Sequence, residues 1–176
     1  MTIVCTPNCA FLSETSRQIA IYKALLASGM PAVLATHGGP YDFLFKQEGV
    51  PCTRLDPQLT NEEAARYLAA IFNPMLRFYQ PAVLREHVLN EIKFFRESGA
   101  SAVVSGFTLS TALSARAAGV PLIVTHAGSF VPIVIERGLF RWSDAFDNLL
   151  LDVVPRGWFD RMIRWMGGPP TSDYAS

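Results

Sequence analysis

The chain has 176 residues, half of them hydrophobic, and its 15 basic side chains balance its 15 acidic ones. That length is enough for one domain with a full hydrophobic core, and the balanced charge gives no reason to expect a nucleic acid partner. The three cysteines, Cys5, Cys9 and Cys52, have neither a disulfide-framework count nor zinc-site spacing, so we expect buried thiols, no metal site and no cofactor. No uncharged run reaches the roughly 20 residues of a membrane-spanning helix, and the first residues lack a secretory signal. We therefore expect a soluble, cytoplasmic protein.

The predicted elements alternate between strands and helices. In chain order they are a strand over 2–6, a helix over 17–28 begun near Glu14, a strand over 32–36, a helical turn over 42–47, a strand over 52–55, helices over 61–72 and 76–98, a strand over 102–105, a helix over 109–118 and a strand over 122–125. A glycine follows four of the predicted helices, at positions 29, 49, 99 and 119, as is typical of helix ends. This alternation predicts an α/β fold class: a Rossmann-like three-layer domain with a mostly parallel sheet flanked by helices.

A helical insertion is predicted at about 60–98, between the third and fourth strands. Thr60 and Glu63 have the spacing of a capping box at its first helix. Along its second helix, apolar residues recur every three or four positions together with His87 and Glu91, so most of one face is apolar. We interpret His87 as a packed or solvated side chain.

The loops that follow the strands predict the functional site, because sheets of this type bind ligands at the carboxyl ends of their strands. Glu14 and His126 are the candidate catalytic proton acceptors. Glu14 could instead complement the positive end of a helix dipole, and the histidines after the strands could act as bases or cap the next turn. The expected substrate-binding residues are Ser13, His37, Gly38, Gly39, Tyr41, Phe107, Gly128, Ser129 and Phe130.

Several common nucleotide and hydrolase motifs do not occur in the sequence. After the first strand, residues 7–12 read Pro-Asn-Cys-Ala-Phe-Leu, which is neither a Gly-x-Gly-x-x-Gly fingerprint nor a phosphate loop, and no Gly-x-Ser-x-Gly motif exists. The sequence therefore disfavours a nucleotide hydrolase, a dinucleotide-dependent dehydrogenase and a serine hydrolase.

Four segments share the pattern of a known family. They are Phe-Leu-Ser-Glu-Thr-Ser-Arg at 11–17, the run from Ala-Leu-Leu at 24–26 to His-Gly-Gly-Pro-Tyr at 37–41, Gly-Val-Pro-Cys-Thr-Arg-Leu-Asp-Pro at 49–57, and Ala-Ala-Gly-Val-Pro-Leu-Ile-Val-Thr-His at 117–126. Over roughly residues 1–140, the chain resembles the amino-terminal half of GT-B glycosyltransferases, especially the UDP-glycosyltransferase-like group.

The resemblance implies an acceptor-binding Rossmann-like domain over residues 1–166. Residues 167–176 would be a linker or tail towards a carboxyl-terminal domain that binds the nucleotide-sugar donor, and the acceptor would be a small molecule or lipid-linked. The family often places a Gly-His pair after the first strand, with the histidine as catalytic base. Here Ser13 and Glu14 stand at that place, so either Glu14 substitutes for the histidine or the domain has no base of its own.

The residues near the carboxyl end leave further alternatives open. Residues 156–166 carry a stripe of Phe, Met and Ile at helical spacing, which could contact the inner face of a membrane or pack on the domain. The chain could form a homodimer through apolar surface. Besides the acceptor-binding domain of one enzyme, the sequence permits a non-catalytic subunit of a split glycosyltransferase or a freestanding Rossmann-like small-molecule-binding domain.

Overall fold

A computed structural model describes residues 2–72 and 79–125, which belong to one compact unit of the chain, residues 1–126. The strands are β1 Thr2–Thr6, β2 Ala32–Thr36, β3 Thr53–Arg54, β4 Ala100–Ser105 and β5 Leu122–Val124. The helices are α1 Leu12–Ala27, α2 Phe43–Gln47, α3 Asn61–Phe72, α4 Pro81–Glu97 and α5 Leu109–Ala118.

The five strands form one parallel sheet in the order β3-β2-β1-β4-β5. Val4 lies between Val33 of β2 and Val103 of β4, which fixes the register at the centre of the sheet. From β1, the next two strands are added towards one edge of the sheet, β2 and then β3. The chain then returns to the centre, where β4 pairs with β1, and β5 is added towards the other edge. The strand order therefore reverses between β1 and β4, and such a switch point opens a crevice for ligands at the carboxyl ends of the strands.

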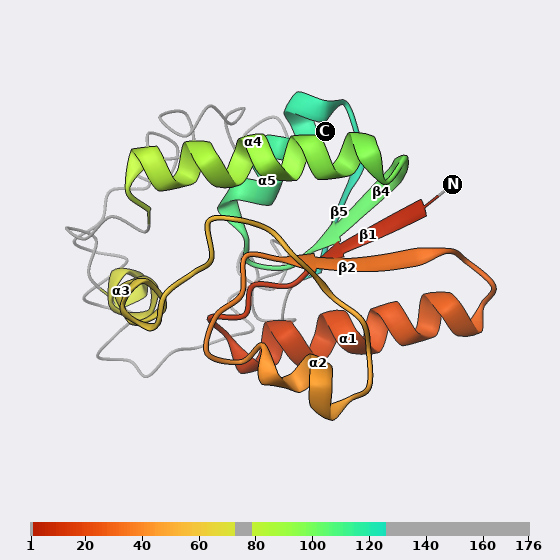
Figure 1. Cartoon of the computed structure of the whole chain (residues 1–176), viewed down its shortest axis with the longest axis horizontal. Helices are drawn as coiled ribbons and strands as arrows, with labels where there is room; N and C mark the ends of the chain where they lie inside the picture. The colour runs from red at the N-terminus through yellow and green to blue at the C-terminus, as the bar shows by residue number, and fades with distance from the viewer. Residues whose placement is uncertain (1, 73–78, 126–176) are drawn as a thin grey trace, which may run out of the picture. The chain divides into compact units, whose positions relative to one another are not determined.

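Helices cover both faces of the sheet, with α1 and α2 on one side and α4 and α5 on the other (Figure 1). Neighbouring strand residues point to opposite faces, as the two-residue period of a strand requires. Cys5, Leu34 and Val104 thus pack in the cluster with α1 and α2, whereas Val4, Ala35 and Val103 pack in the cluster on the other face. Burial on both faces explains why the strands are continuous apolar runs.

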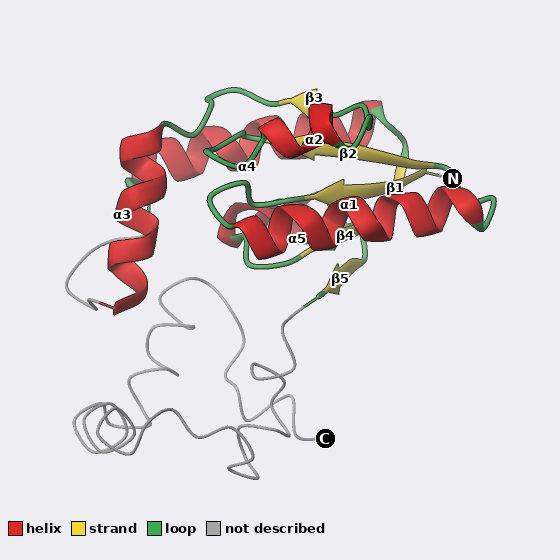
Figure 2. Cartoon of the chain, turned by 90° about the horizontal axis from the view of Figure 1, so that it is seen from below, coloured by secondary structure: helices red, strands yellow, loops and turns green. Residues whose placement is uncertain are grey.

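The helix α3 stands beyond the carboxyl ends of the strands, apart from the two helical layers (Figure 2). Its capping box is confirmed, because the Glu63 backbone N–H donates to Thr60 Oγ1 and the Glu63 carboxylate accepts from the Thr60 backbone N–H. The next helix, α4, packs against α5 and β4 and thereby provides the crossover from β3 to β4. The predicted helical insertion therefore contains one helix that covers a face of the sheet, α4, and one that lies beyond the carboxyl ends of the strands, α3.

The predicted α/β fold class is confirmed, and four elements match their predicted bounds, namely β1, β2, α3 and α5. The start of α1 was predicted too late. Its first turn begins at Leu12, because Thr15 and Ser16 do not cap the helix and instead donate back to the carbonyls of Phe11 and Leu12 within it.

Two further boundaries differ from the prediction for physical reasons. The helix α4 begins at Pro81 instead of residue 76, and proline suits a first helical turn because its missing N–H would have no partner there. The strand β4 begins at Ala100, two residues early, because Thr2 pairs with Ala100 across a register shift.

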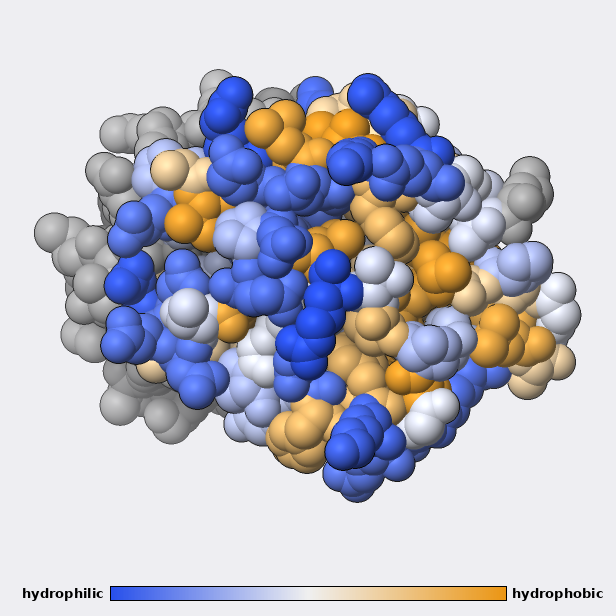
Figure 3. Space-filling view, viewed as in Figure 1, coloured by the Kyte–Doolittle hydropathy of each residue, from blue (hydrophilic) through white to orange (hydrophobic). Residues whose placement is uncertain are grey.

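The face shown in Figure 3 is neither uniformly polar nor uniformly apolar. On the face shown in Figure 3, hydrophilic side chains are spread among smaller groups of hydrophobic ones. This mixed surface agrees with the balanced numbers of basic and acidic residues in the sequence.

The loops after β1 and β2 touch at Gly39. The Tyr41 backbone N–H donates to the Cys9 carbonyl at 3.1 Å, and a Cβ on Gly39 would lie 2.6 Å from the Cys9 carbonyl carbon. Gly39 also has a φ of +138°, which disfavours any other residue. The absence of a side chain at this position therefore lets the two loops lie side by side.

We predict that Gly39→Ala lowers the free energy of unfolding by about 2–5 kcal/mol, since overpacking adds to backbone strain. Gly29→Ala is the matched control, because Gly29 has a φ of +73° but no atom lies within 4 Å of the position that its Cβ would take. It should lose only about 1–2 kcal/mol for the left-handed backbone. Urea unfolding of both variants measures the difference, and equal losses would contradict the close contact with Cys9.

Candidate functional site

Asn8 joins the two loops that flank the switch point of the sheet. It follows β1, and its Nδ2 donates to the Phe107 carbonyl after β4 at 2.8 Å. Its Oδ1 accepts from the Ala10 backbone N–H at 3.1 Å, which fixes the orientation of the amide. The Asn8 amide thus links the loops after β1 and β4 at the switch point, with both its nitrogen and its oxygen hydrogen-bonded.

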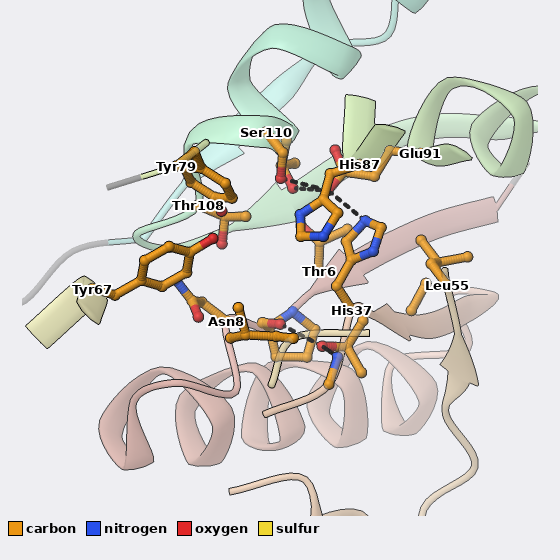
Figure 4. A pocket seen from close by; sticks show the side chains of 16 residues that line it. Thr6, Asn8, His37, Leu55, Tyr67, Tyr79, His87, Glu91, Thr108 and Ser110 are labelled. Atoms are coloured by element: carbon orange, nitrogen blue, oxygen red, sulfur yellow. Dashed lines mark hydrogen bonds and ion pairs between the residues drawn. The ribbon is translucent and has the colours of Figure 1, made fainter. Parts of the chain in front are cut away.

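A small cavity, here called the histidine cavity, lies at this edge on the α4 side of the sheet (Figure 4). Its volume is about 20 Å³, room for a group the size of one water molecule. Residues from all of the first four strand ends and from α3, α4 and α5 line it, among them Thr6, Asn8, His37, Leu55, Tyr67, Tyr79, His87, Glu91, Thr108 and Ser110.

Glu91 of α4 provides the buried negative charge beside the cavity. It is 1% exposed, and three hydroxyls of α5 donate to its carboxylate. Ser110 and Thr111 bond to Oε1 at 2.8 and 3.2 Å, and Ser114 bonds to Oε2. These donors replace the water that the carboxylate loses on burial, and they fasten α4 to α5.

The rings of His37 and His87 stack beside this carboxylate, with centroids 3.7 Å apart and planes 10° from parallel. His37 Nδ1 lies 3.1 Å from the Pro57 carbonyl, so Nδ1 carries a proton and donates to that oxygen. His37 Nε2 lies 3.5 Å from Glu91 Oε1, within the range of an ion pair but outside hydrogen-bond geometry. Nε2 of His87 also has no hydrogen-bond partner among the described residues.

Burial lowers the pKa of His87 from 6.5 to about 4, and a positive charge on His37 would lower it further. Glu91 acts in the opposite direction but is outweighed. His87 is therefore neutral at physiological pH, with one ring nitrogen able to accept a hydrogen bond and the other able to donate one.

Two tyrosines form the other side of the cavity. Tyr67 comes from α3 and Tyr79 from the residues before α4, and their ring centroids are 4.7 Å apart. The Tyr79 ring also meets His87 edge-on at 5.7 Å. Burial raises the pKa of both phenols, so they remain neutral and act as hydrogen-bonding groups with apolar bodies.

A second polar cluster lies at the same edge on the α1 side, around Glu14. Its Oε1 pairs with Arg17 at 2.7 Å, and its Oε2 accepts from the Phe107 backbone N–H at 3.3 Å. Arg17 also donates to the Thr125 carbonyl at 3.2 Å. The carboxylate occupies the space beside Gly106, where a Cβ would lie 1.4 Å from Oε2.

The structure thus separates the predicted site residues into groups. His37 and Gly38 line the histidine cavity, whereas Glu14 belongs to the cluster on α1. Ser13 is exposed, Gly39 and Tyr41 are half-buried, and Phe107 is exposed and packs edge-on against Phe11. The remaining predicted residues, His126, Gly128, Ser129 and Phe130, lie outside the described residues.

Sequence reasoning missed most of the histidine cavity. His87 and Glu91 are one helical turn apart on an otherwise apolar face of α4, and two ionisable side chains at that spacing were the available signal. No sequence pattern marked the other residues of the cavity, Tyr67, Tyr79 and Thr108. They reach it only because of where α3 and the loop after β4 lie in the folded structure.

Two further properties concern only residues 2–72 and 79–125. No group of three or more His, Cys, Asp or Glu side chains there could hold a metal ion. In the same part of the chain, no helix has the length and apolar character needed to cross a membrane.

This Rossmann-like α/β fold is shared with GT-B glycosyltransferases. The Streptomyces sp. SF2575 glycosyltransferase SsfS6 is 16% identical, with a TM-score of 0.53 over 97% of this chain and 47% of that one. The spinosyn forosaminyltransferase SpnP is 14% identical, with a TM-score of 0.53 over 100% of this chain and 44% of that one. MurG of Acinetobacter baumannii is 14% identical, with a TM-score of 0.52 over 71% of this chain and 35% of that one.

The chain therefore spans less than half the length of each of these structures. At such low identity, the likeness establishes the fold and assigns no activity. No protein-family model matches the sequence, and no curated protein matches it.

We predict that His87 makes the stability of the protein depend on pH. Because its folded-state pKa is lowered, the unfolded chain binds more protons, and stability falls as pH drops from about 6.5 towards about 4. The slope from this group is at most about 1.4 kcal/mol per pH unit. His87→Phe keeps a flat ring in the stack but removes the titration, so urea unfolding at pH 7 and 5 should show a smaller loss in the variant.

Glu86→Gln is the control for this experiment, because Glu86 is an exposed titratable residue on the same helix. It should retain the wild-type loss between pH 7 and 5. A His87→Phe variant with the same pH dependence as the wild type would show that His87 does not carry the effect.

We also predict that Gly106→Ala displaces the Glu14 carboxylate and lowers the free energy of unfolding by about 1–3 kcal/mol. In a Glu14→Ala background the added methyl group meets no carboxylate, so the same substitution should cost less. A double-mutant cycle from urea unfolding measures this coupling. Strictly additive losses would mean that Glu14 does not occupy the space beside Gly106.

Proposed function

We propose that this domain binds the acceptor of a glycosyltransferase, which moves a sugar from a nucleotide-sugar donor to an acceptor hydroxyl. The supporting observation is a set of buried polar side chains at the switch point of a fold shared with glycosyltransferases. SsfS6, one of those enzymes, has been solved with thymidine diphosphate. By analogy, a nucleotide-sugar donor would be the second substrate here, held mainly by a second domain or subunit.

In the proposed reaction, the acceptor oxygen attacks the anomeric carbon of the sugar while the bond to the diphosphate breaks. A base takes the proton from the acceptor hydroxyl, and Glu14 and His126 are the candidates. Glu14 is held by Arg17 and by the Phe107 backbone N–H, so it would have to give up one of these contacts to meet the acceptor. Arg17 also donates to the carbonyl of Thr125, so the Glu14 cluster includes the end of the strand that precedes His126 in the sequence.

The acceptor would be a small molecule or a lipid-linked hydroxyl compound at this carboxyl edge. Within the proposal, Ser13, Tyr41 and Phe107 offer a polar and aromatic rim, and Gly38 and Gly39 allow a ligand close to the backbone. Residues 128–130 would complete the rim. The proposed compartment is the cytoplasm, with residues 156–166 as the candidate contact with a membrane surface.

The function is tested by incubating the 176-residue chain with UDP- and TDP-sugars and a panel of hydroxyl acceptors. We expect no sugar transfer by the chain alone, because the donor would be held elsewhere. Transfer should appear when a donor-binding domain or partner is supplied, and Glu14→Gln should then lower kcat by about 10²–10⁴-fold if Glu14 is the base. Lys23→Gln, at an exposed position further along the same helix, is the matched control for folding.

Three results would count against the proposal. Robust transfer by the isolated chain would show that it holds both substrates. Tight binding of NAD or a related dinucleotide in calorimetry would favour a freestanding small-molecule-binding domain. Transfer that needs a second chain and is insensitive to both Glu14 and His126 substitutions would favour a non-catalytic subunit.

A further inference from the structure

Three buried polar atoms around the histidine cavity have no hydrogen-bond partner among the described residues. They are Nε2 of His37, Nε2 of His87 and Oγ1 of Thr108. The two histidines are 9% and 2% exposed, so bulk water does not reach their rings freely. Leaving one such group unpaired costs about 1–3 kcal/mol. Three of them around one cavity point to a ligand group that pairs with them.

The hydrogen-bonding state of these atoms restricts what that group can be. His37 Nδ1 donates to the Pro57 carbonyl, so in the neutral ring Nε2 carries a lone pair and accepts. His87 is neutral above about pH 4, and a threonine hydroxyl can donate or accept. An alcohol hydroxyl can donate its one proton to His37 Nε2, while its oxygen accepts from Thr108 Oγ1 and from His87 in the tautomer that carries its proton on Nε2. It does so without adding charge.

Charge excludes the common anionic groups. Glu91 lies on the wall of the cavity, 3.5 Å from His37 Nε2, and its carboxylate is already bonded to hydroxyls of α5. A ligand carboxylate or phosphate would face this negative charge among buried side chains, where repulsion is stronger than in bulk water.

Size and wall composition fit one hydroxyl. The cavity volume of about 20 Å³ admits a single small group. Leu55, Leu59 and the rings of Tyr67 and Tyr79 supply the apolar part of the wall. A polar centre with apolar sides is the usual form of a small-molecule site.

We propose that the histidine cavity is a subsite for a single alcohol hydroxyl, which pairs with His37, His87 and Thr108. This assignment deepens the proposed function and rests on it, since the subsite would recognise one hydroxyl of the acceptor. The binding test below uses no sugar donor, so its failure is distinguishable from a failure of sugar transfer.

Methanol is the probe, because it carries one hydroxyl and little else. The full chain is titrated with methanol at pH 7 while the ring carbon-bound protons of its three histidines are followed by NMR, each assigned from a single variant. We expect the His37 and His87 signals to shift and to saturate with one affinity, instead of changing linearly as in a solvent effect. Acetonitrile, which accepts hydrogen bonds but donates none, should give no saturable shift.

Two variants test which residues form the subsite. His87→Phe keeps the stacked ring but removes Nε2, and Thr108→Val removes the hydroxyl at similar size. Each should weaken the methanol affinity read from His37 by about five- to tenfold, the effect of one hydrogen bond. Glu86→Gln, on the exposed side of α4, should leave the affinity unchanged. If one variant does not fold, the other still tests the assignment.

The proposal is overturned if methanol shifts the His37 and His87 signals only linearly, or if acetonitrile produces the same saturable shift. Unchanged affinity in a folded His87→Phe or Thr108→Val variant would also overturn it. Saturable methanol binding together with no sugar transfer under any condition would retain the subsite and reject the glycosyltransferase function.

Discussion

The buried carboxylate of Glu91 constrains how the α4 side of the molecule is built. With 1% of the residue exposed, its charge has to be matched inside the protein. Ser110, Thr111 and Ser114 do so from one face of α5, and His37 stands at ion-pair distance from the end of β2. The charge of Glu91 thus connects α4, α5 and the loop after β2. The alignment of these three elements leaves the histidine rings stacked at the carboxyl edge.

The sheet divides the chemistry of that edge into two parts. On the α4 side lies a small cavity with two unpaired histidine nitrogens and a carboxylate already bonded to hydroxyls, features that suit a small polar group. On the α1 side, Glu14 and Arg17 link the loop after β4 to the end of β5. Between the two parts, Asn8 links the loop after β1 to the loop after β4 by its hydrogen bond to the Phe107 carbonyl. In the proposed function, the α4 side would bind a hydroxyl of the acceptor, and the α1 side would supply charged groups for reaction or positioning.

Much of the fold was predictable because its signals are local. Glycines 29, 49, 99 and 119 all have positive φ at helix ends, as their positions after apolar and charged runs indicated. The Thr60 and Glu63 capping box was readable for the same reason, since three residues contain the whole interaction. A predicted helix boundary was wrong where a hydroxyl side chain could form either of two local hydrogen bonds. Thr15 and Ser16 looked like caps but bond back within α1, and only the entry of the chain from Phe11 decides between these outcomes.

The candidate site was predictable only in part, and the reason is the range of the contacts. The order of strands and helices along the sequence determined a parallel sheet and predicted a ligand site at its carboxyl edge. It put His37 directly after β2 and Glu14 in the first turn of α1, the helix that follows β1. Tertiary structure alone decided that Glu14 pairs with Arg17, and that His37 stacks on His87, 50 positions later in the sequence. Periodicity and turn residues act over a few positions. The stacking, the buried charge and the unpartnered nitrogens arise from segments that meet only when the helices pack on the sheet.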